Sequence, residues 1–393
     1  MSEKMNSGRT IMAQLLDFLP QYEFKKIVKK YNGNHKVKTF TCWEQLIVMM
    51  FAQLANRESL RDIESCLSAY SKKLYHCGIK STIAKSTLAD ANERRDWMIF
   101  SEYASLLIER ARVLYKDDGG FSDELKSLVY VLDSTTIDLC LNLFPWAVFR
   151  KNKGAVKMHT IMDISGSIPT IIWITDGSIH DVNMLDMVDF ETGAIYVMDK
   201  AYIDFERLYN IHLSAAYFVI REKENMKFRR VYSREVDKET GVKSDQTIKL
   251  TGVQSVKKYP DHIRRVKFYD VVENRTYFFL TNNFKFDSLD IARLYKERWG
   301  VELLFKWIKQ HLRIKKFFGT SYNAVCIQIW IAITSYVLIL IIKKEMKLKQ
   351  TPYTILQILS VSLFEKTPIN QLFENLYDCL DEINNSNQLS LFD

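Results

Sequence analysis

Hydrophobic and polar positions change their spacing along the chain, and this change predicts three regions. Residues 1–125 show apolar positions at helical spacing, as in the strongly apolar segment 43–54 and in 59–67, where Ser59 is the expected N-cap. From residue 128 the apolar positions form short runs rich in β-branched and aromatic residues, which favours buried strands. From 321 to about 382 the pattern is helical again.

The middle region predicts a mixed sheet. The expected strands are 128–132, 156–162, 169–175, 194–198 and 217–220, and the expected helices are 181–188 and 205–213. The first three strands form an antiparallel meander, and the later helices are crossovers that make the strands at 128 and 194 parallel neighbours. This is the layout of ribonuclease-H-like folds.

A second β pattern interrupts this region. Residues 221–277 are rich in Lys, Arg, Val and Tyr and predict strands at 247–251, 265–269 and 276–280. We therefore expect an α/β protein, in which a ribonuclease-H-like mixed sheet with a β-rich insertion is flanked by an α-helical N-terminal domain and an α-helical C-terminal region. The expected boundaries are 1–125, 126–325 with the insertion at 221–277, and 326–393.

The segment after the insertion combines two stripes on one predicted helix. Tyr295, Arg298, Glu302 and Lys309 return to nearly the same side of the helix. An apolar stripe lies about 80° away. It consists of Leu294, Val301, Phe305, Ile308 and Leu312. This flank is expected to press on the sheet, with Glu302 at its edge, although an Arg–Glu pair at this spacing is also an ordinary surface contact.

Composition and charge narrow the classes of protein that fit. The chain has 393 residues, 47% of them hydrophobic, and a net charge of +8, which is compatible with a polyanionic partner. The six cysteines form no CxxC pair, so free thiols in a reducing cytoplasm are expected rather than a zinc cluster or a disulfide scaffold. The N-terminus has no signal-peptide pattern. The apolar run 327–342 is shorter than the roughly 20 residues that span a bilayer and predicts a buried helix, not a membrane anchor.

Two aspartates follow predicted parallel strands. Asp133 and Asp199 each come directly after an apolar run, so their carboxylates are expected at the same edge of the sheet, close to Glu302. Three such carboxylates without paired cations would repel each other, and divalent cations would relieve the repulsion. An Asp after a strand is, however, commonly a turn or cap residue. The other acids of the region are expected elsewhere: Asp163 in a turn, Asp181 as a helix N-cap, Asp176 at the end of an edge strand, and Asp138 and Asp204 past the ends of strands.

Two weaker signals stay open between a structural and a functional role. Asp181, after His180, is either a helix N-cap, which we favour, or a group that supports the metal ligands. Trp299 and Trp307 either pack against another part of the protein, which we favour, or stack on DNA.

The combination of motifs resembles the DDE transposases of the IS-four insertion-sequence family. That family has an Asp after its first strand, an Asp after its fourth, and a helix with the spacing Tyr-(2)-Arg-(3)-Glu-(6)-Lys. The matching segments here are Val-Leu-Asp133-Ser-Thr-Thr, Val-Met-Asp199-Lys-Ala-Tyr, and the helix from Tyr295 through Glu302 to Lys309. The resemblance extends from the helical N-terminal region to about residue 375.

The resemblance implies a site and a cofactor. Asp133, Asp199 and Glu302 would hold two Mg²⁺ ions, for which Mn²⁺ can substitute, and Tyr295, Arg298 and Lys309 would contact DNA phosphates. Lys306 and Arg313 extend the basic character of the helix, in positions that favour backbone contacts. Some members use a hairpin intermediate with a flipped base stacked on a Trp of the insertion. Residues 221–277 contain no Trp, so Tyr232, Phe268 or Tyr269 would have to serve, or this route is not used.

The expected function is therefore that of a transposase. It would bind the terminal repeats of an insertion sequence through residues 1–125, cleave the DNA ends and join them to target DNA by two-metal phosphoryl transfer. A catalytically inactive, transposase-derived DNA-binding regulator is the alternative. The expected partners are double-stranded DNA, at the transposon ends and the target, and a second copy of the chain in a synaptic complex that region 326–393 helps to hold. The expected place is the bacterial cytoplasm, at the nucleoid.

Overall fold

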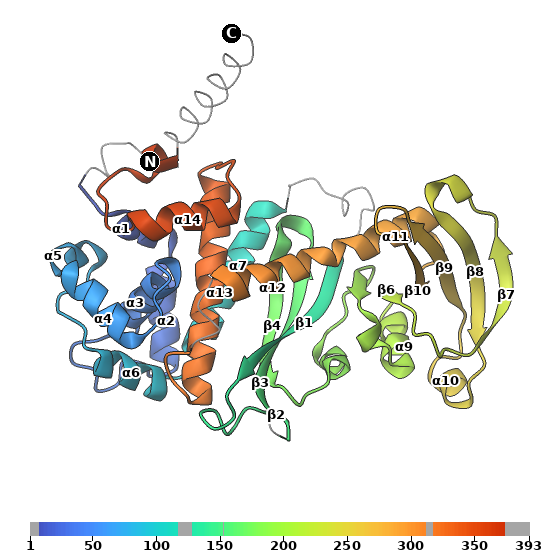
Figure 1. Ribbon diagram of the computed structural model, residues 1–393, viewed down its shortest axis with the longest axis horizontal. Coiled ribbons are helices and arrows are strands. Elements are labelled where there is room, and N and C mark those ends of the chain that lie inside the picture. The colour runs from blue at the N-terminus through green and yellow to red at the C-terminus, as the bar shows by residue number, and fades with distance from the viewer. Residues whose placement is uncertain (1–7, 117–127, 152, 312–316, 374–393) are drawn as a thin grey trace, which may run out of the picture. The chain divides into compact units, whose positions relative to one another are not determined.

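A computed structural model describes residues 8–116, 128–151, 153–311 and 317–373 (Figure 1). The chain forms two compact units. Residues 1–114 and 307–393 make up the helical unit, and residues 115–306 make up the sheet unit. The helices after residue 321 thus share a unit with the N-terminal ones. The division into functional domains at 125 and 325 stays a prediction.

The helical unit consists of short helices around one long one. Its α-helices are α1 (Ile11–Leu15), α2 (Gln21–Lys30), α3 (Cys42–Leu54), α4 (Leu60–Ala69), α5 (Ser71–Leu74), α6 (Lys85–Arg94), α7 (Met98–Tyr115), α13 (Tyr322–Glu345) and α14 (Pro352–Ser362), and its 3₁₀ turns are η2 (Leu16–Phe18) and η3 (Tyr75–Cys77). Side chains of Thr41, Ser59 and Ser321 cap α3, α4 and α13 by accepting backbone N–H groups of the first turn. The predicted cap at Ser59 is confirmed.

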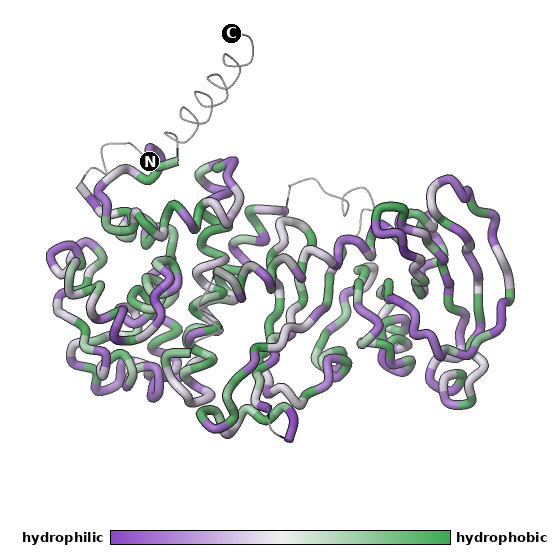
Figure 2. The backbone as a smooth tube through the Cα atoms, viewed as in Figure 1, coloured by the Kyte–Doolittle hydropathy of each residue, from purple (hydrophilic) through white to green (hydrophobic). Residues whose placement is uncertain are grey.

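Helix α13 is the core of the helical unit. Every residue from Ala324 to Ile342 is buried, and the helix contacts α3, α6 and α14. A helix that is apolar on all sides must be covered all round, and Figure 2 shows the hydrophobic positions that run along it. Among the residues that the structure describes, it is the one helix long and apolar enough to cross a membrane, but that stretch lies entirely inside the protein. The prediction of a buried helix at 327–342 is confirmed.

Within the described residues, the sheet unit contains one sheet of ten strands. They are β1 (Val129–Leu139), β2 (Val148–Arg150), β3 (Lys153–Asp163), β4 (Ile168–Asp176), β5 (Ile195–Met198), β6 (Tyr217–Arg221), β7 (Phe228–Arg234), β8 (Val242–Leu250), β9 (Ile263–Asp270) and β10 (Arg275–Thr281). The order is β2-β3-β1-β5-β6-β10-β9-β8-β7, and β4 also pairs with β3. The helical segments of this unit are η4 (Ser165–Ser167), η5 (Asp181–Met187), η6 (Lys200–Tyr202), α9 (Phe205–Leu213), η7 (Lys238–Thr240), α10 (Val253–Lys258) and α11 (Ser288–Glu297).

The central strands have the ribonuclease-H-like arrangement. In the order β4-β3-β1-β5-β6, only β3 runs against the other four strands. The meander and the parallel neighbours β1 and β5 are therefore confirmed. The predicted helix at 181–188 is a 3₁₀ helix, η5, and its first residue Asp181 is not its cap.

The insertion is a continuation of the sheet. Strand β10 pairs with β6, so β7 to β10 extend the sheet on the far side from β4. Strand β7 was not predicted because its sequence, Phe-Arg-Arg-Val-Tyr-Ser-Arg, has no apolar run. It lies at the edge, where a strand can expose most of its side chains. Helix α10 was also not predicted.

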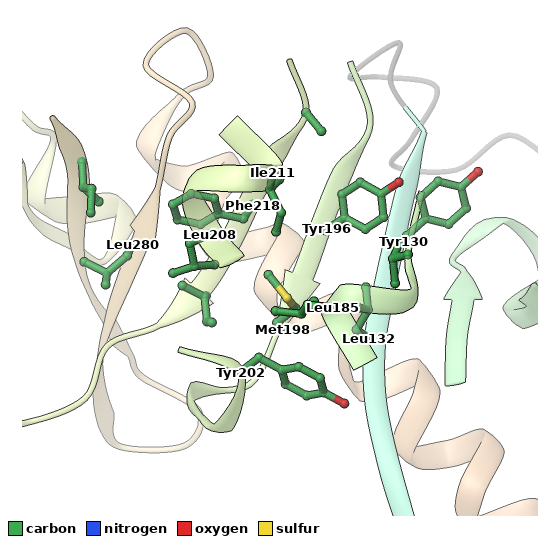
Figure 3. Close-up of a cluster of buried hydrophobic side chains, with 14 of the residues drawn as sticks. Tyr130, Leu132, Leu185, Tyr196, Met198, Tyr202, Leu208, Ile211, Phe218 and Leu280 are labelled. Atoms are coloured by element: carbon green, nitrogen blue, oxygen red, sulfur yellow. The ribbon is translucent and has the colours of Figure 1, made fainter. Parts of the chain in front are cut away.

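A hydrophobic core covers one face of the sheet (Figure 3). The labelled residues come from β1, β5, β6, β10, α9, η5 and η6: Tyr130, Leu132, Leu185, Tyr196, Met198, Tyr202, Leu208, Ile211, Phe218 and Leu280. Because side chains alternate along a strand, the residues between Tyr130, Leu132 and Ser134 on β1 point to the opposite face. Val131 and Asp133 are those residues, and helix α11 packs on that opposite face against β5, β6, β8 and β9.

Candidate active site

The first two predicted acids occupy neighbouring positions on parallel strands. Strand β1 pairs with β5 so that Leu132 lies opposite Met198, and Asp133 and Asp199 come next on each strand. Asp133 does not end its strand, however. Strand β1 continues to Leu139 along β3, with Asp133 opposite Thr160. Only β5 of these two strands ends here, at Met198, and Asp199 follows it directly.

Asp199 also acts as a cap. Its carboxylate accepts the backbone N–H of Ala201 at 3.0 Å and begins the 3₁₀ turn η6. This contact fixes the rotamer of Asp199, while the residue stays half-buried.

The third predicted acid lies on the segment after α11. The single helix expected at 295–309 is two helices, α11 and α12 (Trp299–His311), with Arg298 in helical dihedrals at the junction. The apolar flank is buried at Leu294, Val301, Phe305 and Ile308, while Leu312 lies outside the described residues. Gly300 lies against the sheet, since a Cβ there would come within 3.0 Å of Met162 on β3. Glu302 is partly exposed.

Arg298 joins Asp133 to Glu302. Its Nη1 donates to Asp133 Oδ2 at 2.7 Å, and its Nη2 donates to Glu302 Oε1. The expectation that the three carboxylates have no paired cation is therefore wrong. The Arg–Glu spacing of four residues did predict the second contact, but the first joins residues 165 positions apart.

Burial dominates the electrostatics of Asp133. The pKa of the Asp133 carboxyl is raised to about 6, and burial is the largest cause. Arg298 and the Ser134 N–H lower this pKa, and the like charges of Glu302 and Asp199 raise it. The repulsion between the acids is thus present, but a guanidinium offsets part of it.

The acids have the oxygen ligands that suit a divalent cation, but a guanidinium lies between two of them. Carboxylate oxygens are the ligands that Mg²⁺ prefers, and Arg298 stands in for a cation between two of them. Within the described residues no three His, Cys, Asp or Glu side chains lie close enough to hold a metal as they stand.

The predicted phosphate-contacting residues lie in different surroundings. Tyr295 is buried, with its ring centroid 4.8 Å from that of Phe279 on β10, and burial raises the pKa of its phenol. Lys306 is exposed and Lys309 is half-buried on α12, while Arg313 lies outside the described residues.

A cavity of about 570 Å³ opens beside Arg298, between the insertion and α11. Its walls are aromatic and charged, and they include Arg221, Phe268, Asp270, Arg275, Tyr277, Phe279, Tyr295, Lys296, Arg298 and Trp299. Trp299 is 60% exposed, so the packing role that we favoured for it is wrong. Of the three expected substitutes for the missing Trp, Phe268 lines the cavity. Tyr232 lies exposed on the edge strand β7, and the Tyr269 hydroxyl donates to Asn274.

A polar network supports the strands on the face opposite Asp133. Asp181 Oδ1 accepts from Ser134 Oγ at 2.7 Å and from Lys157 Nζ at 3.1 Å. His159 lies beside it, with Nε2 3.0 Å from Thr175 Oγ1, and burial lowers the His159 pKa to about 4. The N-cap role favoured for Asp181 is therefore wrong. Lys157 and His159 gave a sequence signal only as polar residues facing inward on an otherwise apolar strand.

The other acids each lie at a different kind of position in the fold. Asp204 caps α9 through the N–H groups of Glu206 and Arg207. Asp176 ends the edge strand β4, as expected. Asp163 is the last residue of β3 and lies opposite Tyr130, so the turn expected there is wrong. Asp138 is exposed but lies within β1, so its expected place past the strand end is also wrong.

Known proteins resemble the chain over most of its length. A putative transposase of Sinorhizobium fredii is 32% identical over 72% of this chain and 78% of its own. A probable transposase for an insertion sequence element of Geobacillus stearothermophilus is 27% identical over 85% of each chain. A solved piggyBac transposase synaptic complex with hairpin DNA aligns with 96% of this chain and 86% of its own, with 10% identity and a TM-score of 0.45.

Two family models match separate parts of the chain. Residues 7–80 match a domain of unknown function, and residues 124–338 match the transposase DDE domain. The second match spans Asp133, Asp199 and Glu302 and covers more than half of the chain. On these matches, and on a sheet order that fits them, the chain belongs to the DDE transposases of insertion sequences.

Proposed function

We propose that this transposase cleaves DNA at the ends of its insertion sequence and joins them to target DNA, with Asp133, Asp199 and Glu302 as its metal ligands. One observation carries the proposal. The β1–β5 register sets Asp133 beside Asp199, and one guanidinium joins Asp133 to Glu302. Three carboxylates from distant parts of the sequence thus belong to one neighbourhood.

The cofactor would be two Mg²⁺ ions, with Mn²⁺ as a substitute. Bound there, they would activate a water or a 3′-hydroxyl and stabilise the leaving oxygen of an in-line displacement. The protein's own part is to hold the acids. Asp133 is fixed by β1, Asp199 by its cap on η6, and Glu302 by the buried flank of α12.

The DNA contacts are proposed on the same side of the sheet. Arg298 and Lys309 on the helices would hold phosphates near the acids, together with Tyr295 if its buried hydroxyl becomes accessible, and Lys306 and Arg313 would contact the backbone. The insertion supports a polyanionic partner: residues 221–281 contain fifteen Lys and Arg against nine Asp and Glu, a net charge of +6 out of the chain's +8. If the hairpin route is used, the aromatic cavity that Phe268 and Trp299 line would take the flipped base.

Recognition and assembly belong to other parts of the chain. We propose that residues 1–125 bind the terminal repeats, that two copies join the two ends, and that region 326–393 contributes to that dimer. The proposed place of action is the cytoplasm, at the nucleoid. A gel shift with the helical region and end DNA, against random DNA as control, tests the first statement.

The deciding experiment compares single isosteric variants. Asp133→Asn, Asp199→Asn and Glu302→Gln should each abolish Mg²⁺-dependent cleavage of end DNA while the fold and DNA binding persist. Asp138→Asn, an exposed acid on the same strand as Asp133, is the matched control and should keep activity. Nicking that survives all three substitutions would refute the site. A wild-type protein that binds ends without cutting would favour the regulator.

A further inference from the structure

The guanidinium of Arg298 occupies the space between two proposed metal ligands. It contacts Asp133 Oδ2 through one terminal nitrogen and Glu302 Oε1 through the other, and only 15% of the side chain is exposed. Arginine stays charged at every relevant pH and can only donate hydrogen bonds. The two carboxylates therefore already share one positive charge that does not depend on pH.

A metal ion and this guanidinium compete for the same two carboxylate oxygens. A divalent cation bound to Asp133 Oδ2 and Glu302 Oε1 would replace the N–H donors there and would repel the guanidinium at short range. Arg298 therefore lowers the affinity of the site for metal as long as it keeps this position. Metal binding therefore becomes more favourable when the guanidinium leaves this position.

The surroundings of Arg298 suggest what moves it. Its Nε is buried and has no hydrogen-bond partner in the structure as described, so the guanidinium has a donor left over. The aromatic cavity with Arg221, Arg275 and Lys296 on its walls opens beside it. A DNA phosphate in or near this cavity would accept two parallel hydrogen bonds from the guanidinium, a geometry that arginine forms readily.

We propose that Arg298 is a displaceable counter-cation, which keeps the carboxylates neutralised without metal and passes to a DNA phosphate when the end is bound. The inference rests on the proposed function and deepens it, because it couples the metal site to DNA. Linkage requires the coupling to be mutual, so that metal also strengthens DNA binding. Such a transposase would bind metal at its active site mainly when a DNA end is present.

Mn²⁺ binding tests the proposal without any measurement of activity. Electron paramagnetic resonance of free Mn²⁺ gives the dissociation constant for the full chain in the absence of DNA. Arg298→Gln should bind Mn²⁺ about tenfold more tightly than wild type, because the competing charge is gone. Arg293→Gln removes an exposed arginine of α11 that pairs with Asp290, and it should leave the constant unchanged. Asp133→Asn in the Arg298→Gln background should remove the gain.

The second arm uses duplex DNA from the ends of the protein's own insertion sequence. This DNA should tighten Mn²⁺ binding to wild type about tenfold and change Arg298→Gln much less. If Arg298→Gln does not fold, as judged by circular dichroism, the effect of DNA on wild type alone decides. Equal Mn²⁺ affinity of wild type and variant, or no effect of DNA on wild type, would overturn the competition while leaving the metal site intact. Absence of Mn²⁺ binding that depends on Asp133, with and without DNA, would instead overturn the proposed function itself.

Discussion

The buried ion pair between Asp245 on β8 and Arg264 on β9 provides the sharpest stability prediction. Both side chains are 3% exposed, and the contact is bidentate: Arg264 Nε donates to Oδ1 at 3.0 Å and Nη2 to Oδ2 at 2.7 Å. Arg264 Nη1 also donates to the carbonyls of Asn283 and Phe286, in the loop that leads into α11. The pair thus connects the insertion to the helix that precedes Arg298.

Replacing Asp245 by Asn keeps the shape and removes the charge. With about 4 Å between the charge centres and an effective dielectric constant of about 20, the lost attraction is about 4 kcal/mol. This agrees with the cost of about 3–5 kcal/mol for breaking a buried pair and leaving one charge unpaired. Since domains are stable by only about 5–15 kcal/mol, the sheet unit should unfold at much lower urea.

The assay is urea denaturation at pH 7.5, with hydrogen exchange over β8, β9 and α11 to locate the loss. The matched control is Asp186→Asn, because Asp186 pairs with Arg207 at 2.6 Å but is 52% exposed. It should cost less than about 1 kcal/mol. An Asp245→Leu, Arg264→Met double variant should recover part of the loss, because the fully buried charge of Arg264 is removed together with its partner, while Arg234, the other arginine on Asp245, is 30% exposed. If Asp245→Asn costs no more than Asp186→Asn, the reasoning is refuted.

Three further predictions concern the sheet unit. His159 is buried, and burial lowers its pKa to about 4. Its contribution to the free energy of unfolding is therefore complete above the unfolded pKa of about 6.5. As the pH falls toward about 4, up to about 3 kcal/mol of this contribution is lost. His159→Gln should flatten that pH dependence in urea titrations, and equal slopes would contradict this. Asp181→Asn should lower the free energy of unfolding by about 2–3 kcal/mol in urea denaturation, because the Lys157 ammonium then keeps only its hydrogen bond to the Ile179 carbonyl. Unchanged stability would mean that the Lys157–Asp181 pair has no net effect. Phe279→Ala should lower the free energy of unfolding by about 3–5 kcal/mol and increase hydrogen exchange in α11, because the ring is 2% exposed and packs on Tyr295. The control Tyr232→Ala, on the exposed edge strand, should lower it by less than about 0.5 kcal/mol. Similar losses for both variants would contradict the prediction.

The sequence was a good guide where the pattern is local. Short apolar runs predicted the central strands, and the handedness and order of crossovers predicted that β1 and β5 are parallel neighbours. Ser59 and the helix 205–213 followed from cap and periodicity rules. In each case the residues that decide the structure are close together in the sequence.

Contacts between distant residues could not be predicted in the same way. The spacing of Arg298 and Glu302 indicated a pair, but nothing in it indicated that Asp133 would share the guanidinium. Asp181 looked like a cap because Asp favours that position, while the inward-facing Lys157 and Ser134 determine its role. Strand β7 has no apolar pattern because it lies at the edge of the sheet, where the side chains on both faces of a strand can stay exposed.

The pairing of β10 with β6 has a consequence for how such a chain can vary. Arg221 and Phe279 lie opposite each other in this pairing, so the chain leaves the central sheet and returns to it at almost the same point. The residues between them form an inserted segment that begins and ends at the same place in the sheet. The length of this inserted segment therefore has no effect on where the next helix begins. Asp199 and Glu302 can therefore be 103 positions apart in numbering (302 − 199) without being far apart in space. Related enzymes could therefore have longer, shorter or different inserted segments while the positions of the acids in the fold stay the same.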